Sequence, residues 1–316
     1  MSEGDVRLWC VNSAEKAAVE SVLGERVLGW RELAGGYSHQ TCGLDLASGQ
    51  AVVRFGGASA DVEAEVMRRA AAYVPVPDVR VVRKSNDEAV RSFMVIDHVA
   101  GVLLSDVLAA DDADGGIADL GAAVAEVSLG IGAVAIASRP GFFADTELRV
   151  PPERAWSQQL PDVAAECMER TPDSRLDADV RRAWVDLCTT HAPALAEIDD
   201  LACLVHSDFN PKNILVRSTA HGWEVASVLD WEFAYAGCPA ADAGNLLRHA
   251  DDYPGGFVEG FRTTYGAGTS IADWEYLGTV IDMFALSELV TRPVGMYPAD
   301  RAAGRIRALL DTGVGL

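Results

Sequence analysis

The sequence predicts an α+β fold in two lobes, a small β-rich lobe followed by a larger, mostly helical one. The first hundred residues consist mainly of short β-prone runs bounded by Gly and Ser, a pattern typical of antiparallel strands joined by turns. From Leu103 onward the chain is rich in Ala and Leu at helical spacing. We therefore expect an N-terminal lobe at residues 1–98 and a C-terminal lobe at residues 99–316, joined near residues 97–101.

The N-terminal lobe is predicted to be a meander of strands with one inserted helix. The segment DVEAEVMRRAAAY, residues 61–73, has the composition of a helix. Pro75-Val76-Pro77 ends this helix, because proline disfavours helical geometry in the residue before it. A turn at Ser48-Gly49 separates two of the strands. The strands are expected at residues 27–33, 41–46, 51–55, 79–84 and 91–99.

The C-terminal lobe is predicted to be helical, with one interruption. Helices are expected at roughly residues 117–137, 152–170 and 176–196. The runs LACLVHSDFNPKNILV and WEVASVLDWEFA, residues 201–216 and 223–234, then place short apolar strands beside polar loops. After Pro239 the helical pattern returns and continues to the end of the chain.

Length and composition favour a folded cytoplasmic protein. The chain has 316 residues, of which 49% are hydrophobic, enough for a substantial core. Its start, MSEGDVRLWC, lacks the basic and apolar regions of a secretory signal. The longest apolar stretch, residues 117–137, is interrupted by Asp119 and Glu126, so we expect no membrane span. Six cysteines without a CxxC pair favour free thiols over disulfides or zinc.

The net charge indicates which kinds of molecule the protein is expected to bind. The net charge is -21, with 47 acidic against 26 basic residues, which argues against a nucleic-acid-binding surface because phosphate contacts need clustered Lys and Arg. A cationic substrate suits this field. The competing interpretation is that the acidic residues only keep the protein in solution.

Two polar segments between apolar runs carry the residues best suited to chemistry. In the first, His206-Ser207-Asp208-Phe209-Asn210-Pro211-Lys212-Asn213, a carboxylate stands five residues before an amide, and both can reach one ligand. Phosphoryl transfer uses such a pair, an Asp that orients the attacking hydroxyl and an Asn oxygen that coordinates Mg²⁺. The second segment, Val228-Leu229-Asp230, ends a strand in a further acidic residue from which the same ions are within reach.

These segments resemble the aminoglycoside phosphotransferase family, which is related to choline kinases and more remotely to protein kinases. The family loop is written H-G-D-x-x-x-x-N, and His206, Asp208 and Asn213 match it, while Ser207 stands where Gly is usual. The resemblance implies a bilobal protein-kinase-like fold. It also implies that Asp208 is the catalytic base, that Asn213 and Asp230 hold Mg²⁺, and that His206 supports the loop.

The same resemblance also assigns roles to one further residue of the C-terminal lobe and to the nucleotide-binding residues of the N-terminal lobe. Asp242 matches a family residue expected to brace the catalytic loop. Arg54 stands where protein kinases carry a phosphate-binding lysine, and Glu63 matches the acid that pairs with this cation, with Glu65 as the competing choice. The remaining nucleotide contacts are expected from Gly35, Gly36 and Ser38 of the loop GGYSH and from the backbone of Asp97 and Val99 at the hinge.

Several alternatives stay open. His206 can serve only to hydrogen-bond the backbone, without transferring a proton in the reaction. Arg54 can be a surface ion-pair partner. His39 replaces the Asn common in the family's nucleotide loop. Candidate substrate-binding acids in the helical lobe are Asp251, Asp252, Asp282 and Glu288.

The predicted activity is transfer of the γ-phosphoryl group of ATP or GTP, with Mg²⁺, to a hydroxyl group of a small molecule. The first candidate acceptor is an aminoglycoside or another cationic antibiotic, which would make the protein a resistance enzyme. The alternative is a metabolic kinase for choline, homoserine, a thiosugar or an amino sugar. A more remote alternative, from another class, is a nucleotide-binding module without catalysis.

Overall fold

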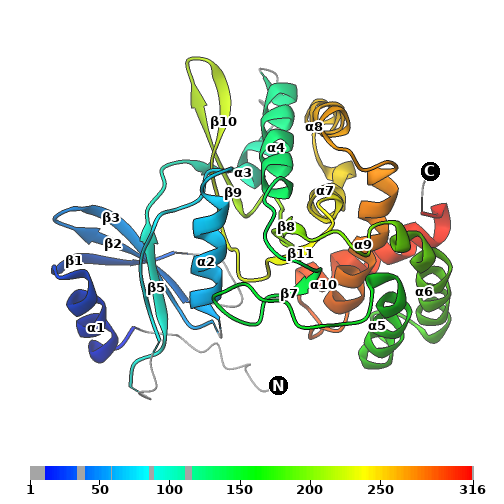
Figure 1. The fold of residues 1–316 in the computed structure, drawn as a ribbon, viewed down its shortest axis with the longest axis horizontal. Coiled ribbons are helices and arrows are strands. Elements are labelled where there is room, and N and C mark those ends of the chain that lie inside the picture. Colours follow the sequence, from blue (N-terminus) through cyan, green and yellow to red (C-terminus); the bar gives the residue numbers. More distant parts are fainter. Residues whose placement is uncertain (1–10, 34–39, 58, 85–88, 111–115, 315–316) are drawn as a thin grey trace.

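The computed structural model describes residues 11–33, 40–57, 59–84, 89–110 and 116–314. Its architecture is the expected α+β arrangement, a five-stranded antiparallel sheet followed by a mostly helical part (Figure 1). The sheet has the order β1-β2-β3-β5-β4. Its strands are β1 (Val27–Glu32), β2 (Gln40–Leu46), β3 (Gly49–Phe55), β4 (Val79–Arg83) and β5 (Phe93–Asp97).

A helix that the sequence reading missed covers one face of this sheet. Helix α1 (Ser13–Leu23) begins with a capping box, in which Asn12 and Glu15 each accept a hydrogen bond from the other's backbone N–H. Ala18 and Val19 of α1 pack against apolar side chains of β1, β2, β3 and β5. The buried Glu15 also receives two hydrogen bonds from the Arg91 guanidinium, of 2.5 and 3.1 Å, which ties the helix to the start of β5.

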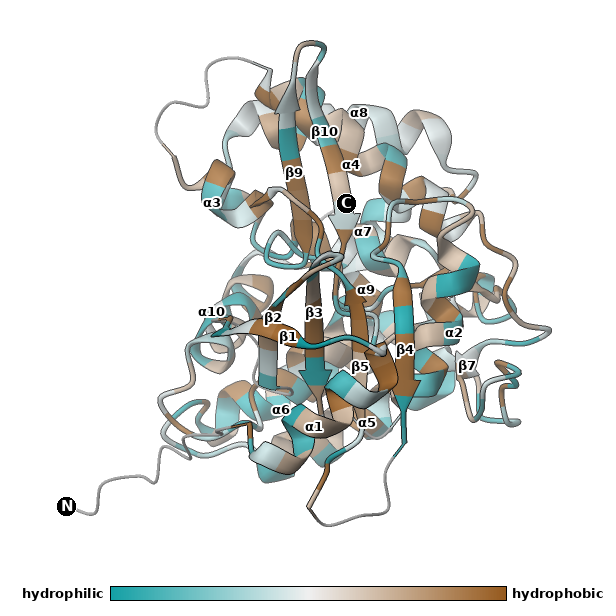
Figure 2. Ribbon diagram, turned by 90° about the vertical axis from the view of Figure 1, so that its left-hand side faces the viewer, coloured by the Kyte–Doolittle hydropathy of each residue, from teal (hydrophilic) through white to brown (hydrophobic). Residues whose placement is uncertain are grey.

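Helix α2 (Ala60–Ala70) lies between the sheet and the helical part (Figure 1). Its apolar residues Ala64, Met67 and Ala70 share a core with Met94 and Ile96 of β5. Figure 2 shows the matching pattern in the sheet, where β3 and β5 are predominantly apolar. The helix ends shortly before Pro75, as predicted. One face of α2 is therefore fixed against the sheet, and Glu63 in its first turn is held in a defined place.

The helical part begins after β5 and contains two small sheets. Strands β6 (Val102–Leu103), β9 (Ile214–Thr219) and β10 (Gly222–Val228) form one, in the order β10-β9-β6. Strands β7 (Gly141–Phe142), β8 (Cys203–Val205) and β11 (Tyr235–Gly237) form the other, in the order β7-β11-β8. The helices are α3 (Leu104–Leu108), α4 (Ile117–Gly132), α5 (Trp156–Arg170), α6 (Ala178–His191), α7 (Ala240–Leu247), α8 (Gly255–Gly268), α9 (Trp274–Leu289) and α10 (Tyr297–Thr312), with short 3-10 turns at Ala192–Glu197 and Ala250–Asp252.

Helix α7 is placed by close contact with α9. A Cβ atom added at Gly244 of α7 would lie 2.3 Å from the carbonyl oxygen of Gly278 on α9, so neither position tolerates a larger residue without a shift. This packing matters for the site because α7 carries Asp242 near its start and is followed by Arg248.

Two further expectations concern the membrane and the cysteines. Among the described residues, no helix is both long and apolar enough to cross a bilayer. The five cysteines that the structure describes are free thiols, and Cys42, Cys167, Cys188 and Cys238 are buried.

Candidate active site

Residues 206–213, predicted as the catalytic loop, connect β8 to β9, and the chain turns sharply at Ser207. Ser207 has φ +71°, a left-handed backbone conformation that glycine adopts without strain and L residues rarely adopt. This explains in physical terms why Gly is usual at the position. The turn leaves Asp208 partly accessible at the start of the loop.

Both carboxylate oxygens of Asp208 are held by amide side chains of the same loop. Asn210 Nδ2 donates to Oδ1 at 2.7 Å, and Asn213 Nδ2 donates to Oδ2, also at 2.7 Å. Asn213 also donates to the Asp208 carbonyl at 2.9 Å. Since the nitrogen end of the Asn213 amide is used in this way, its oxygen is the end that remains for a cation. The sequence reading gave Asn210 no role, although its spacing from Asp208 is that of a common local turn.

His206 is fully buried and is fixed by two backbone contacts. Its Nε2 lies 2.8 Å from the Leu229 carbonyl oxygen, and its Nδ1 accepts the Asp208 N–H at 3.2 Å. Nδ1 must therefore be unprotonated and Nε2 must carry the hydrogen, which is the neutral form. Burial lowers the pKa of His206, in agreement with this form. The geometry supports the alternative in which His206 holds the loop and carries no proton in the reaction.

Asp242 braces the loop from α7. Its Oδ2 accepts the His206 N–H at 2.8 Å, and its Oδ1 accepts the Ser207 N–H at 2.9 Å. The side chain is buried, and burial raises the pKa of Asp242 to about 7, against the opposing effect of the two N–H groups. The strained turn at Ser207 is thus stabilised by a carboxylate from a helix fixed against α9.

The β9–β10 hairpin brings Asn213 and Asp230 together. Its register pairs Ile214 with Val228, and the Leu229 N–H donates to the Asn213 carbonyl at 2.8 Å. Asp230, the next residue, consequently lies beside Asn213, 17 positions away in the sequence. Asp230 also adopts a left-handed conformation, with φ +65°, so the chain turns sharply at this strand end.

Arg54 on β3 joins the sheet to this strand end. Its Nη1 donates to Glu63 Oε1 at 2.5 Å and its Nη2 donates to Asp230 Oδ1 at 2.6 Å, with the guanidinium buried. Glu63 Oε1 also accepts the Trp231 N–H at 3.2 Å. The acid that pairs with Arg54 is therefore Glu63, and the competing Glu65 instead binds Arg68 and Arg69 on the outer side of α2. Arg54 is not a surface ion-pair partner.

Only some of the other residues predicted to contact the nucleotide are among those that the structure describes. Gly35, Gly36, Ser38 and His39 lie outside the described residues. Asp97 ends β5, and its N–H donates to the Asp78 carbonyl at 2.9 Å, so a purine contact there would use the Asp97 carbonyl. Val99 lies two residues further on, between β5 and β6.

The donor set at Asn213 and Asp230 fits Mg²⁺. Both residues offer hard oxygen atoms, and Mg²⁺ is commonly held by one or two protein oxygens together with phosphate oxygens and water. Arg54 binds Oδ1 of Asp230, and Oδ2 is the oxygen of this carboxylate that would bind the cation. Within the described ranges there is no group of three His, Cys, Asp or Glu side chains that would form a metal site of another kind.

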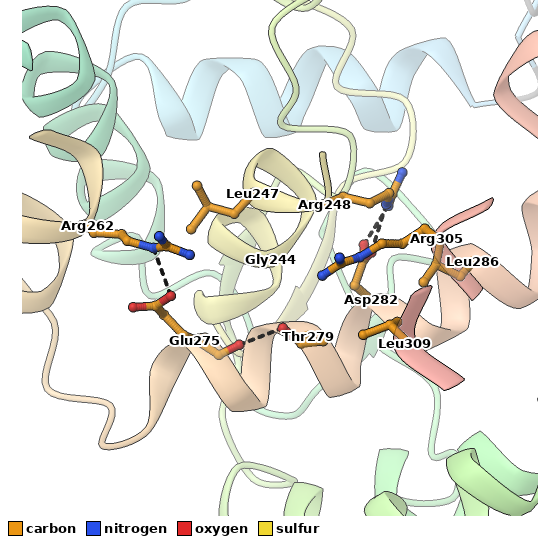
Figure 3. A pocket seen from close by; sticks show the side chains of 10 residues that line it. All are labelled: Gly244, Leu247, Arg248, Arg262, Glu275, Thr279, Asp282, Leu286, Arg305 and Leu309. Atoms are coloured by element: carbon orange, nitrogen blue, oxygen red, sulfur yellow. Dashed lines mark hydrogen bonds and ion pairs between the residues drawn. The ribbon is translucent and has the colours of Figure 1, made fainter. Parts of the chain in front are cut away.

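The predicted substrate-binding acids differ in their surroundings. Asp282 is buried and bound at both oxygens by Arg248, at 2.7 and 2.5 Å (Figure 3). Asp252 is bound by Arg301. Asp251 is exposed, and Glu288 is exposed on α9 beside α5, where its charge adds to the effect of burial in raising the pKa of the Cys167 thiol. Sequence reasoning missed Arg248 and Arg301, because a pairing between helices leaves no local pattern.

Comparisons with known proteins agree with this fold. The model of a family described as "Phosphotransferase enzyme family" matches residues 29–278. A thermostable variant of aminoglycoside phosphotransferase APH(4)-Ia, in ternary complex with ADP and hygromycin B, is 18% identical with a TM-score of 0.74, and the match covers 96% of this chain and 100% of that one. Aminoglycoside phosphotransferase APH(2″)-IIIa, in complex with GDP and kanamycin, is 16% identical with a TM-score of 0.64, covering 93% and 96%. Among curated proteins, no sequence matches the chain.

Proposed function

Because the chain belongs to the phosphotransferase enzyme family, we propose that it transfers the γ-phosphoryl group of ATP or GTP to a hydroxyl group of a small molecule. The observation that carries this function is the convergence of Asp208, Asn213 and Asp230 at the base of one hairpin, with Arg54 bound to Asp230. Phosphoryl transfer requires a group that orients the attacking hydroxyl, oxygen ligands for Mg²⁺ and a cation near the phosphates, and these four side chains from the two lobes can supply them.

In the proposed mechanism the nucleotide lies between residues 1–98 and residues 99–316. Its purine faces the backbone of Asp97 and Val99, and its phosphates face Arg54 and the loop with Gly35, Gly36 and Ser38. Glu63 keeps the Arg54 fork oriented. Mg²⁺ held by Asn213 and Asp230 would neutralise charge on the phosphates.

Asp208 is the group proposed to act on the acceptor. Its two oxygens are fixed by Asn210 and Asn213, so it can accept a hydrogen bond from the acceptor hydroxyl and align that oxygen with the γ-phosphorus. The proton of the hydroxyl passes to the Asp208 carboxylate as the new P–O bond forms and the bond to the leaving nucleoside diphosphate breaks. Such general-base help contributes about 10²- to 10⁴-fold in rate.

Two acceptor classes are supported by different observations. The structures of APH(4)-Ia with hygromycin B and APH(2″)-IIIa with kanamycin, together with the net charge of -21, support an aminoglycoside and a role in antibiotic resistance. The pairing of Asp252 and Asp282 with arginines favours a metabolic acceptor that is not a polycation. In either case the reaction would take place in the cytoplasm, where nucleoside triphosphates are available.

The test is a coupled nucleotide-turnover assay with Mg²⁺ over kanamycin, hygromycin B, choline, homoserine and amino sugars. Acceptor-stimulated turnover should fall at least about 10²-fold in Asp208→Asn, which keeps the shape of the side chain and removes the base. Asp186→Asn, an exposed acid on α6, is the matched control and should behave as the wild type. Nucleotide binding without turnover on any acceptor would instead favour the non-catalytic module.

A further inference from the structure

The helical lobe presents a group of charged and aromatic residues beside Asp208, in which the predicted acids Asp252 and Asp282 pair with cations that the sequence did not predict. We call it the acceptor-side cluster, and it consists of Lys212, Arg248, Asp252, Asp282, Tyr297 and Arg301. Lys212 belongs to the catalytic loop, four residues after Asp208. Arg248 follows α7, the helix that braces this loop, and the Asp208 charge is among the causes that raise the pKa of Arg248. The cluster therefore begins next to the proposed base.

Contacts connect its members into one surface. The Lys212 ammonium lies 6.0 Å from the centre of the exposed Tyr297 ring, and Arg301 donates to the Tyr297 hydroxyl at 3.1 Å. Arg301 in turn pairs with Asp252. His249 links this part to Arg248, because burial, then the charges of Arg301 and Arg248, lower its pKa to about 4. His249 is consequently neutral at physiological pH and adds no charge.

The local charge balance does not favour a polycation. Lys212, Arg248 and Arg301 supply three positive charges, against two negative charges on Asp252 and Asp282. Within the described part of the chain, Lys212 has no acidic partner. Adding the exposed Asp251 brings the sum to zero, and the Asp208 carboxylate is counted apart because it is the proposed base for the acceptor hydroxyl. The overall charge of -21 is not decisive here, because charges beyond about 8 Å are largely screened at physiological ionic strength.

The cavity next to Arg248 shows the same excess of cations. It has a volume of about 60 Å³ and is lined by Arg248, Arg262 and Arg305, with Glu275 and Asp282 as the acids (Figure 3). Arg262 binds Glu275 at 2.9 Å and Arg248 binds Asp282, whereas Arg305 makes no ion pair with any described residue. To form an ion pair with Asp282, an ammonium group of the acceptor would have to displace Arg248 from it. Breaking this buried pair would leave the Arg248 guanidinium buried without its partner, which is unfavourable.

On the premise of the phosphotransferase chemistry proposed above, we infer that the acceptor is a hydroxylated molecule carrying an anionic group, a carboxylate or a phosphate ester. Lys212 and Arg301, which both lie over the Tyr297 ring, are the cations that the anionic group meets. The hydroxyl of the same molecule then faces Asp208. Lys212 acts here as a specificity residue, because it attracts the anionic group and repels an ammonium group at the same place.

The test uses three polyols of equal chain length that differ in charge at one carbon, D-gluconate, D-glucitol and D-glucamine, with kanamycin as the polycation. Binding is measured by calorimetry with saturating Mg²⁺ and AMP-PNP, and turnover is measured with ATP and with GTP. We expect gluconate to bind and to turn over best. Lys212→Gln should raise Kd and KM for gluconate about tenfold and leave those for glucitol within about twofold. Lys16→Gln, a lysine that also lies over an aromatic ring but on α1, should change neither.

The outcomes separate this inference from the proposed function. Phosphorylation of kanamycin or glucamine in preference to gluconate would overturn the anionic acceptor and leave the kinase chemistry standing. An equal response to the three polyols, or a gluconate response that Lys212→Gln leaves unchanged, would also overturn it. If AMP-PNP binds but no compound of any charge is phosphorylated, the proposed function itself fails, and the acceptor class fails with it.

Discussion

Arg54 Nη2 on β3 and Asp230 Oδ1 after β10 lie 2.6 Å apart, although 176 residues separate them in the sequence. The same guanidinium binds Glu63 of α2, and Glu63 accepts the backbone N–H of Trp231. The three contacts tie the sheet, helix α2 and the proposed metal-binding strand end together. On the proposed role of Arg54, nucleotide binding and the alignment of Asp230 would be coupled through one side chain.

The first prediction follows from this coupling. Arg54→Met should lower the free energy of unfolding by about 3 kcal/mol, because it leaves Glu63 and Asp230 buried or half-buried without their cation. Chemical denaturation measures the change. The double variant Arg54→Met/Glu63→Leu should be less destabilised than the sum of the two single variants, and destabilisation equal to that sum would show that the pair is not coupled.

Arg54→Lys separates charge from geometry. A lysine keeps the positive charge but loses the planar fork that reaches Glu63 and Asp230 together. We expect folding to be retained and KM for the nucleotide to rise about tenfold, measured by coupled turnover at saturating acceptor. An unchanged KM would mean that only the charge of Arg54 matters.

The strained turn gives the second prediction. Ser207→Gly should raise the free energy of unfolding by about 0.5–1 kcal/mol, because glycine adopts φ +71° without the strain that a side chain causes. The larger conformational entropy of glycine in the unfolded chain offsets part of this gain. Ser218→Gly in strand β9 is the control, and it should lower stability by about 0.5–1 kcal/mol. If both variants lose stability equally, the turn at Ser207 is not strained.

The neutral form of His206 gives the third prediction. His206→Gln should lower kcat about tenfold or more by loosening the Asp208 backbone, without changing the shape of the pH profile of kcat. The reason is that His206 is buried, with its pKa lowered, and is held as a donor to Leu229 and an acceptor from Asp208. Loss of an ionisation near pH 6–7 in the variant would show that His206 takes part in proton transfer.

Those parts of the fold and the site that depend on local sequence patterns could be predicted from the sequence. Short β-prone runs bounded by Gly and Ser predicted the sheet. The spacing of Asp208 and Asn213 predicted that both side chains reach one place, because residues five apart in one loop cannot lie far from each other. The capping box before α1 was readable in Asn12 and Glu15 but was overlooked. By contrast, the pairings Arg248–Asp282 and Arg301–Asp252 depend on how helices α7 to α10 pack, and no spacing in the sequence encodes that packing.

The last prediction concerns Asp242 and the pH dependence of stability. Burial raises its pKa to about 7 in the folded protein, from an ordinary value near 4 in the unfolded chain. Between these two pH values the folded state binds one proton that the unfolded state does not, so this group makes stability fall as pH rises from about 4 to about 7. Its slope is at most about 1.4 kcal/mol per pH unit.

The comparison with Asp242→Asn isolates this effect from that of the other acids. Unfolding by urea is measured at steps between pH 4 and 8 for both proteins. The difference in stability between variant and wild type should grow in favour of the variant as pH rises from 4 to 7 and stay constant above it, because asparagine cannot ionise. A difference that does not vary with pH would mean that the two N–H groups of His206 and Ser207 hold Asp242 ionised throughout, with their stabilisation of the carboxylate exceeding the cost of its burial.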